Sequence, residues 1–194
     1  MATAAEEETP QLQYDGSTPL EIESIHGGPS LALDDRITSV VSAVSVLASD
    51  IFPTLHRLPL PPHPQLLRLL RNSTTSLFIA TSKPSDPFSE ESAIVGYLQT
   101  RQSAGVLHIQ EFGVSLAHRR RSIGSKLLLA ALRCRSYRSR FQAASLLVRD
   151  DPETAPARSL YAKIGFRATE KKASYYQDGV DAIRMEIEAS SVPR

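Results

Sequence analysis

The segment from residue 105 to residue 166 constrains the fold most, because strand-like and helix-like stretches alternate within it. Apolar residues recur with strand periodicity at 105–114 and 141–149, and with helical periodicity at 122–137 and 153–166. A helix with one apolar face needs a sheet or another helix to cover that face. We therefore expect an α/β fold in which helices flank a mixed central β-sheet.

The flanking segments add further elements to this unit. The sequence predicts strands at 19–25, 75–81 and 92–101, helices at 31–52 and 64–71, and a terminal hairpin at 168–188 with its turn at Gln177-Asp178-Gly179. Asp34 or Asp35 is expected to cap the first of these helices. A chain of 194 residues with 41% hydrophobic residues suits one globular domain. We assign this domain to residues 17–190 and expect residues 1–16, which carry three glutamates, to form a disordered acidic tail.

Composition and charge exclude several classes of partner. Twenty-two Lys and Arg against 21 Asp and Glu leave a formal charge of +1, so we expect neither nucleic acid nor a membrane as partner. The single cysteine, Cys134, excludes an internal disulfide, and the first residues lack a signal-peptide pattern. We expect the protein in the cytoplasm or the nucleus. The histidines show no metal-ligand spacing, so we predict no metal.

One loop carries an unusual concentration of positive charge. Arg119, Arg120 and Arg121 follow a predicted strand and stand directly before a predicted helix, with Gly124 inside its first turn. The first amides of a helix lack internal partners, and the helix dipole places positive charge beside them. Such a site binds phosphate. The loop lacks the Gly-Lys-Ser/Thr ending of a Walker loop and the spaced glycines of a dinucleotide fingerprint.

Three ordered motifs resemble the GNAT superfamily of N-acetyltransferases. "RRRSIGS" resembles the family's acetyl-CoA pyrophosphate loop, with Arg119 first, Gly124 last and Ser122 in place of the first glycine. "RSLYAKIGF" is similar to the LYxKxGF motif on a later helix, and "SYYQDGVDAIRM" looks like the terminal hairpin of the protein N-terminal acetyltransferases. The resemblance implies a single GNAT-type domain and an acyltransferase that moves an acetyl group from acetyl-CoA to a primary amine by direct attack.

The resemblance also implies which residues hold the cofactor. Residues of one strand end should pair their backbone with the pantetheine arm, and the loop and helix start should bind the pyrophosphate. The predicted cofactor-binding residues are Phe112, Gly113, Val114, Arg119, Arg120, Arg121, Ser122, Ile123, Gly124 and Ser125. Thr154, where the family usually carries asparagine, completes this set.

Tyr161 is the predicted acid for the departing thiolate, since in this family a tyrosine at this place lies beside the sulfur. The predicted base is Glu111 or His108, with Glu111 slightly favoured. Strict alternation puts these two side chains on opposite faces of one strand. A β-bulge, which this family's strand commonly has, would reverse the facing of one of them.

The resemblance favours a protein N-terminus as acceptor. Phe52 and Pro53, in "IFPT", and Tyr175 and Tyr176, in the hairpin, are the predicted acceptor-binding residues. Strand preferences alone would make the two tyrosines a cross-strand pair. Two alternatives stay open. In the first alternative, the acceptor is a small-molecule amine or a lysine. In the second, the chain is a catalytically weak module that binds acetyl-CoA.

Overall fold

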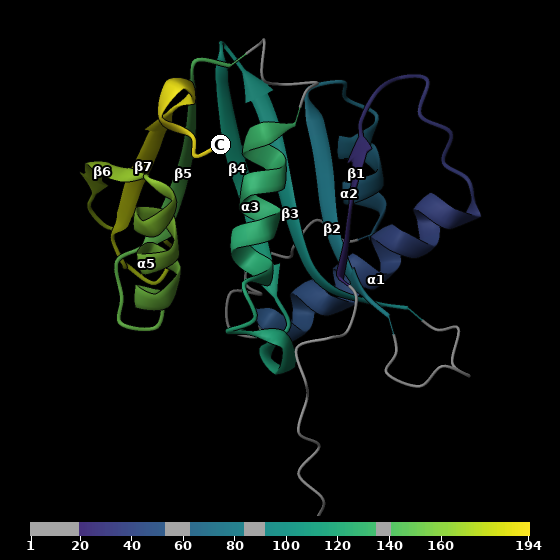
Figure 1. Ribbon diagram of the computed structural model, residues 1–194, viewed down its shortest axis with the longest axis horizontal. Coiled ribbons are helices and arrows are strands. Elements are labelled where there is room, and N and C mark those ends of the chain that lie inside the picture. Colours follow the sequence, from purple (N-terminus) through teal and green to yellow (C-terminus); the bar gives the residue numbers. More distant parts are fainter. Residues whose placement is uncertain (1–19, 53–62, 84–91, 135–140) are drawn as a thin grey trace, which may run out of the picture.

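The computed structural model describes residues 20–52, 63–83, 92–134 and 141–194, with the side chains of residues 63–65 excepted. Seven strands form one sheet in the order β1-β2-β3-β4-β5-β7-β6, and helices lie on both of its faces (Figure 1). The strands are β1 (Leu20–His26), β2 (Thr75–Ser82), β3 (Ala93–Ser103), β4 (Val106–Val114), β5 (Ala143–Arg149), β6 (Arg167–Lys172) and β7 (Ala182–Glu188). The predicted mixed α/β sheet is confirmed.

The connections explain why the sheet is mixed. Strands β1 to β4 pair antiparallel with their neighbours, as do β5, β7 and β6. Between β4 and β5 the chain crosses over through α3 (Ile123–Arg133), so these two strands are parallel.

The predicted acidic tail, at 1–16, and Pro53 lie outside the described residues.

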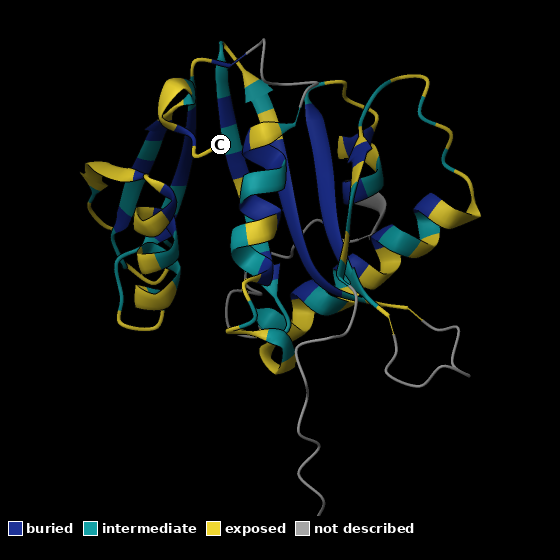
Figure 2. Ribbon diagram, viewed as in Figure 1, coloured by how far each residue is buried: buried dark blue, intermediate teal, exposed yellow. Residues whose placement is uncertain are grey.

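Two apolar clusters hold the helices on opposite faces of the sheet. α3 and α5 (Ala155–Ile164) pack on one face around a large cluster that includes Leu98, Leu127 and Leu146. α1 (Asp35–Ile51) and α2 (His63–Leu70) cover a second cluster on the other face. The central strands β2 and β3 are consequently buried along most of their length (Figure 2). No helix in the described ranges is long and apolar enough to span a membrane.

The parallel strands β4 and β5 stay together over only part of their length. Their pairing runs from Val106↔Ala143 to Ile109↔Leu146, after which β4 continues to Val114 and β5 to Arg149. Figure 1 shows the two strands separating toward the end at which α3 begins. The sheet is therefore split at the carboxyl ends of two parallel strands, where ligands bind in many α/β folds.

The hairpin at the end of the chain is wider than predicted. Pairing of β6 with β7 stops at Lys172↔Ala182, which leaves a connection from 173 to 181. The tip of this connection does turn at Gln177-Asp178-Gly179, because the Gly179 amide donates to the Tyr176 carbonyl at 2.9 Å. We call residues 173–181 the hairpin loop.

Asp34 caps α1, because its carboxylate accepts a hydrogen bond of 2.8 Å from the Ile37 amide. Asp34→Ala should lower the free energy of unfolding by about 0.5–2 kcal/mol, since it leaves that amide without its cap. Asp35→Ala is the matched control, because Asp35 stands in the first turn and acts only through the helix dipole, worth about 0.3–1 kcal/mol. Urea denaturation of both variants measures the difference. Equal losses would contradict the capping assignment.

Candidate active site

The start of α3 faces the end of the sheet split. A short 3₁₀ turn, Leu116–His118, joins β4 to residues 119–122, which we call the arginine loop, and Arg119 Nε donates to the Val114 carbonyl at 3.2 Å. The side chain of the N-cap residue, Ser122, makes no capping hydrogen bond to the first turn of α3, and the Lys126 amide donates to the Ser122 carbonyl at 3.0 Å. The amides of Ile123, Gly124 and Ser125 thus remain available to an anion, as a pyrophosphate requires.

Two residues of the arginine loop adopt the left-handed backbone conformation. Arg120 has φ of 65° and Ser122 has φ of 59°. The predicted loop has serine where the family has its first glycine, and glycine is the residue that adopts this conformation without steric cost. Ser122 therefore keeps the glycine-like backbone path of the loop at the expense of local strain.

Ser122→Gly should stabilise the protein. Relief of the left-handed strain is worth about 1–2 kcal/mol, and the greater freedom of glycine in the unfolded chain takes back about 0.5–1 kcal/mol. The net gain of about 0–1.5 kcal/mol raises the Tm by about 2–4 °C for each kcal/mol in a chain of this size. Ser125→Gly is the matched control: it lies inside α3 and should lower the Tm. A thermal melt in which Ser122→Gly is also less stable than the parent would contradict the strain argument.

Both glycines of the predicted cofactor site are closely packed. A Cβ on Gly124 would lie 3.1 Å from both Phe112 and Leu160, so this glycine brings α3 close to β4 and α5. A Cβ on Gly113 would lie 2.8 Å from Ile51 and 3.2 Å from the ring of Tyr97. On that face the close neighbour of Gly113 is therefore the end of α1.

A β-bulge in β4 places both candidate bases on one face of the sheet. His108 pairs with Arg101 and Ile109 with Thr100, but Glu111 pairs with Gln99, so Gln110 is an extra residue in β4. Arg101 and Gln99 are two residues apart in β3 and point to the same face. His108 and Glu111 consequently share that face, which is the one covered by α1.

The surroundings of the two candidates differ. His108 lies in the paired part of β4, opposite Ser145 of β5, whereas Glu111 lies beyond the last β4–β5 pair. Burial, and then the charges of Arg101 and Arg184, lower the pKa of His108 below its ordinary value, so its neutral form is favoured at pH 7. Burial, and then the charge of the Glu111 carboxylate, raise the pKa of the Tyr97 phenol.

Tyr161 of α5 packs against two other aromatic side chains, Phe112 and Phe166. Its side chain is 7% exposed, and its ring centroid lies 6.2 Å from that of Phe112 and 6.0 Å from that of Phe166. Burial raises the pKa of Tyr161 above its ordinary value, with a smaller contribution from Tyr176. The phenol therefore keeps its proton at neutral pH and can donate it.

Thr154 closes the turn between β5 and α5. Its hydroxyl donates to the Arg149 carbonyl at 2.6 Å, and its amide donates to Asp151 Oδ1 at 2.9 Å. The hydroxyl proton of Thr154 is thus already used in a hydrogen bond within the protein. A hydrogen bond to the cofactor could therefore use this hydroxyl only as an acceptor. The predicted cofactor role of Thr154 stays a prediction.

Three of the predicted acceptor residues, Phe52, Tyr175 and Tyr176, belong to the described part of the chain. Phe52 ends α1, next to Ile51, which approaches Gly113. Tyr175 and Tyr176 belong to the hairpin loop, and their rings meet edge to face with centroids 5.3 Å apart. They are thus neighbours in one loop and not a cross-strand pair, which removes that alternative.

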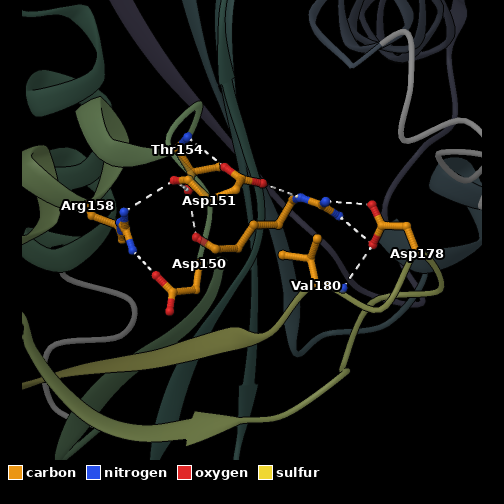
Figure 3. Close-up of polar contacts among 7 residues, drawn as sticks. Asp150, Asp151, Thr154, Arg158, Asp178 and Val180 are labelled. Atoms are coloured by element: carbon orange, nitrogen blue, oxygen red, sulfur yellow. Dashed lines mark hydrogen bonds and ion pairs between the residues drawn. The ribbon is translucent and has the colours of Figure 1, made fainter.

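The sequence analysis missed Arg149, the last residue of β5. Its guanidinium contacts Asp151 and Asp178 and lies over the ring of Tyr176 (Figure 3 shows the two aspartates). The available signal was a basic residue at the carboxyl end of a buried strand followed at once by Asp150 and Asp151. The periodicity of that stretch predicts the end of a strand, but it does not show which side chains an arginine at that position contacts.

The geometry on the α3 side fits the cofactor of the suspected family, since open helix amides, a sheet split and a small residue at 124 occur together. The sequence model of the acetyltransferase (GNAT) domain family matches residues 77–189, which is more than half of the chain. The chain belongs to this family. This GNAT acetyltransferase is thus an acyltransferase with acetyl-CoA as its co-substrate, as expected from the sequence.

Solved structures with the same fold include several acetyltransferases. The ribosomal-protein-S18-alanine N-acetyltransferase from Escherichia coli is similar with a TM-score of 0.63 at 18% identity, covering 88% of this chain and 94% of that one. NAA60 from Arabidopsis thaliana, solved with acetyl-CoA, gives 0.62 at 14%, covering 88% and 98%. The IAA acetyltransferase from Bacillus cereus gives 0.58 at 15%, covering 88% and 99%.

At these identities the likeness concerns the fold and leaves the acceptor open. A search of curated protein sequences finds no significant match to this GNAT acetyltransferase. In the described part of the chain, no group of three or more His, Cys, Asp and Glu side chains is placed to hold a metal ion.

Proposed function

We propose that this GNAT acetyltransferase acetylates a protein N-terminal α-amine. The observation that carries the proposal is the β4 bulge, which turns Glu111 and His108 to one face at the sheet split. Attack requires a neutral amine. An α-amine with a pKa near 8 is already about 10% neutral at pH 7, whereas less than about 0.1% of lysine is. A carboxylate or a neutral imidazole is a weak base and suits the first acceptor better.

Two further observations support this acceptor. The hairpin loop presents an exposed Tyr175 and a half-buried Tyr176, and aromatic side chains of this kind can line a groove for a peptide. The similar structure from Escherichia coli is described as an N-acetyltransferase for the alanine of a ribosomal protein.

The proposed reaction assigns one proton transfer to each side of the split. Acetyl-CoA supplies the acetyl group as a thioester. The amine nitrogen forms a bond to the acetyl carbon, and the bond from that carbon to sulfur breaks. Glu111, directly or through a water, takes the proton that the amine loses. Tyr161 donates its phenolic proton to the sulfur and later regains one from solvent. The backbone of Phe112 to Val114 and the first amides of α3 hold the donor.

A panel assay tests the acceptor. The purified full-length protein is mixed with acetyl-CoA and either a peptide with a free N-terminus, the same peptide with a blocked N-terminus and an internal lysine, or a small polyamine. Released coenzyme A is measured. We expect turnover only with the free N-terminus. Turnover with lysine or polyamine would replace the proposed acceptor, and binding of acetyl-CoA without turnover would indicate a binding module.

A further inference from the structure

The side chain of Arg149 is almost buried at the end of β5, although no expected function uses it. It is 17% exposed, and its Nε lies 2.7 Å from Asp151 Oδ2 while its Nη2 lies 2.6 Å from Asp178 Oδ2. A further bond runs from Nη1 to Asp178 Oδ1 at 3.3 Å. The guanidinium therefore donates to both carboxylate oxygens of Asp178. Its third hydrogen bond, from Nε, goes to one carboxylate oxygen of Asp151 (Figure 3).

The position of Arg149 relates it to the candidate bases. Ser145 is the parallel partner of His108, so the two side chains point to the same face. Arg149 follows Ser145 by four residues in a strand that pairs regularly with β7, so it lies on that face as well. Arg149 thus belongs to the acceptor side of the split, where His108 and Glu111 lie.

Arg149 reaches from there to the tip of the hairpin loop. Asp178 forms that tip, and its Oδ1 also accepts from the Val180 amide at 3.3 Å. The Tyr176 amide donates to the Val180 carbonyl at 3.0 Å, which closes the tip into one small unit. Among the described residues, Arg149 bridges this tip to Asp151 at the end of β5.

The same guanidinium lies over an aromatic ring. Its Cζ is 4.7 Å from the ring centroid of Tyr176, within the range of a cation–π contact. Tyr176 in turn contributes, less than burial does, to raising the pKa of Tyr161. A continuous series of contacts therefore runs from Asp178 through Arg149 to Tyr176.

We propose that Arg149 is a positioning residue that fastens the tip of the hairpin loop to the end of β5 and so holds the ring of Tyr176 in place. The inference rests on the proposed acetyl transfer. Arginine suits this role better than lysine, because one planar group binds two carboxylates and stacks on a ring at the same time. The loop proposed to border the acceptor is thereby positioned by one side chain.

Steady-state kinetics test the effect on the reaction. Arg149→Gln and Asp178→Asn should each lower kcat by about tenfold to a hundredfold, the loss that a small misplacement of a reacting group causes. The KM for the acceptor should rise and the KM for acetyl-CoA should stay unchanged, because the hairpin loop lies on the acceptor side. Arg149→Lys should recover part of the loss.

Lys171→Gln is the matched control. Lys171 is also a cation near this hairpin loop, it binds Asp150 and Asp181 at 2.8 Å and 3.0 Å, and its side chain is 59% exposed. A general loss of hairpin stability would affect this variant as well. A control that loses as much kcat as Arg149→Gln, or an Arg149→Gln variant with the kcat of the parent, would overturn the proposal.

A second measurement does not depend on turnover. In protein labelled with ¹³Cζ-tyrosine, the signals of Tyr176, assigned with Tyr176→Phe, should shift in Arg149→Gln and stay in place in Lys171→Gln. Unmoved signals would overturn the positioning role even if the enzyme is active. Shifted signals in a protein that acetylates no amine would support the positioning role and reject the proposed function.

Discussion

Tyr161→Phe is expected to lower kcat by about 10²-fold with the best acceptor, because a positioned acid contributes about 10²–10⁴ to a rate. The substitution removes one oxygen and keeps the ring that packs on Phe112 and Phe166. The KM for acetyl-CoA should therefore change little. Single-turnover rates of coenzyme A release measure the chemical step directly.

The pH dependence gives an independent check on Tyr161. Because burial raises the pKa of this phenol above its ordinary value of about 10, its proton is retained throughout pH 6 to 9. Loss of Tyr161 should therefore lower kcat by the same factor at every pH in that range. A loss smaller than about threefold, in a variant that melts at the parent temperature, would reduce Tyr161 to a packing role.

Glu111→Gln is expected to produce the second large loss, again about 10²-fold in kcat. Glu111 lies beyond the last β4–β5 pair, where the sheet is open, and His108 lies in the paired part of the strand. His108→Gln should consequently lower kcat less than Glu111→Gln does. Each substitution keeps the approximate shape of the side chain and removes its ability to accept a proton.

The acid limb of the pH profile distinguishes the two bases. Burial and the charges of Arg101 and Arg184 place the pKa of His108 below 6.5. If the imidazole is the base, kcat/KM falls as the pH drops through that lowered value, and His108→Gln abolishes this limb. If Glu111 is the base, His108→Gln leaves the acid limb in place. An acid limb that disappears in His108→Gln would reverse our assignment.

The sequence predicted the order of elements well, because periodicity and turn residues are local signals. The strand from Val106 to Val114 and the helix from Ile123 were expected within one or two residues at their starts. The helix at Ala155–Ile164 ends at Gly165, whose φ of 116° suits glycine, so the predicted end at 166 was two residues late. Motif spacing then identified the family.

Features that depend on the register between strands could not be derived from periodicity. The extra residue Gln110 decides that Glu111 and His108 share a face, and it is visible only in the pairing of β4 with β3. The role of Arg149 likewise depends on where the hairpin loop places Asp178, which is 29 residues away in the sequence. The strain at Ser122 is a backbone angle, and a serine in the sequence does not reveal it.

The split has a consequence for handling the protein. From Phe112 to Val114, β4 pairs with β3 on one side while β5 has already separated from it, so the sheet contains a strand edge in its interior. An edge of this kind is a template on which a strand of another molecule can pair. On the proposed placement, the pantetheine arm covers it. Acetyl-CoA at about 100 times its Kd would add about 2.7 kcal/mol to the free energy of unfolding. The concentration of acetyl-CoA would therefore determine both the turnover of the enzyme and its stability in storage.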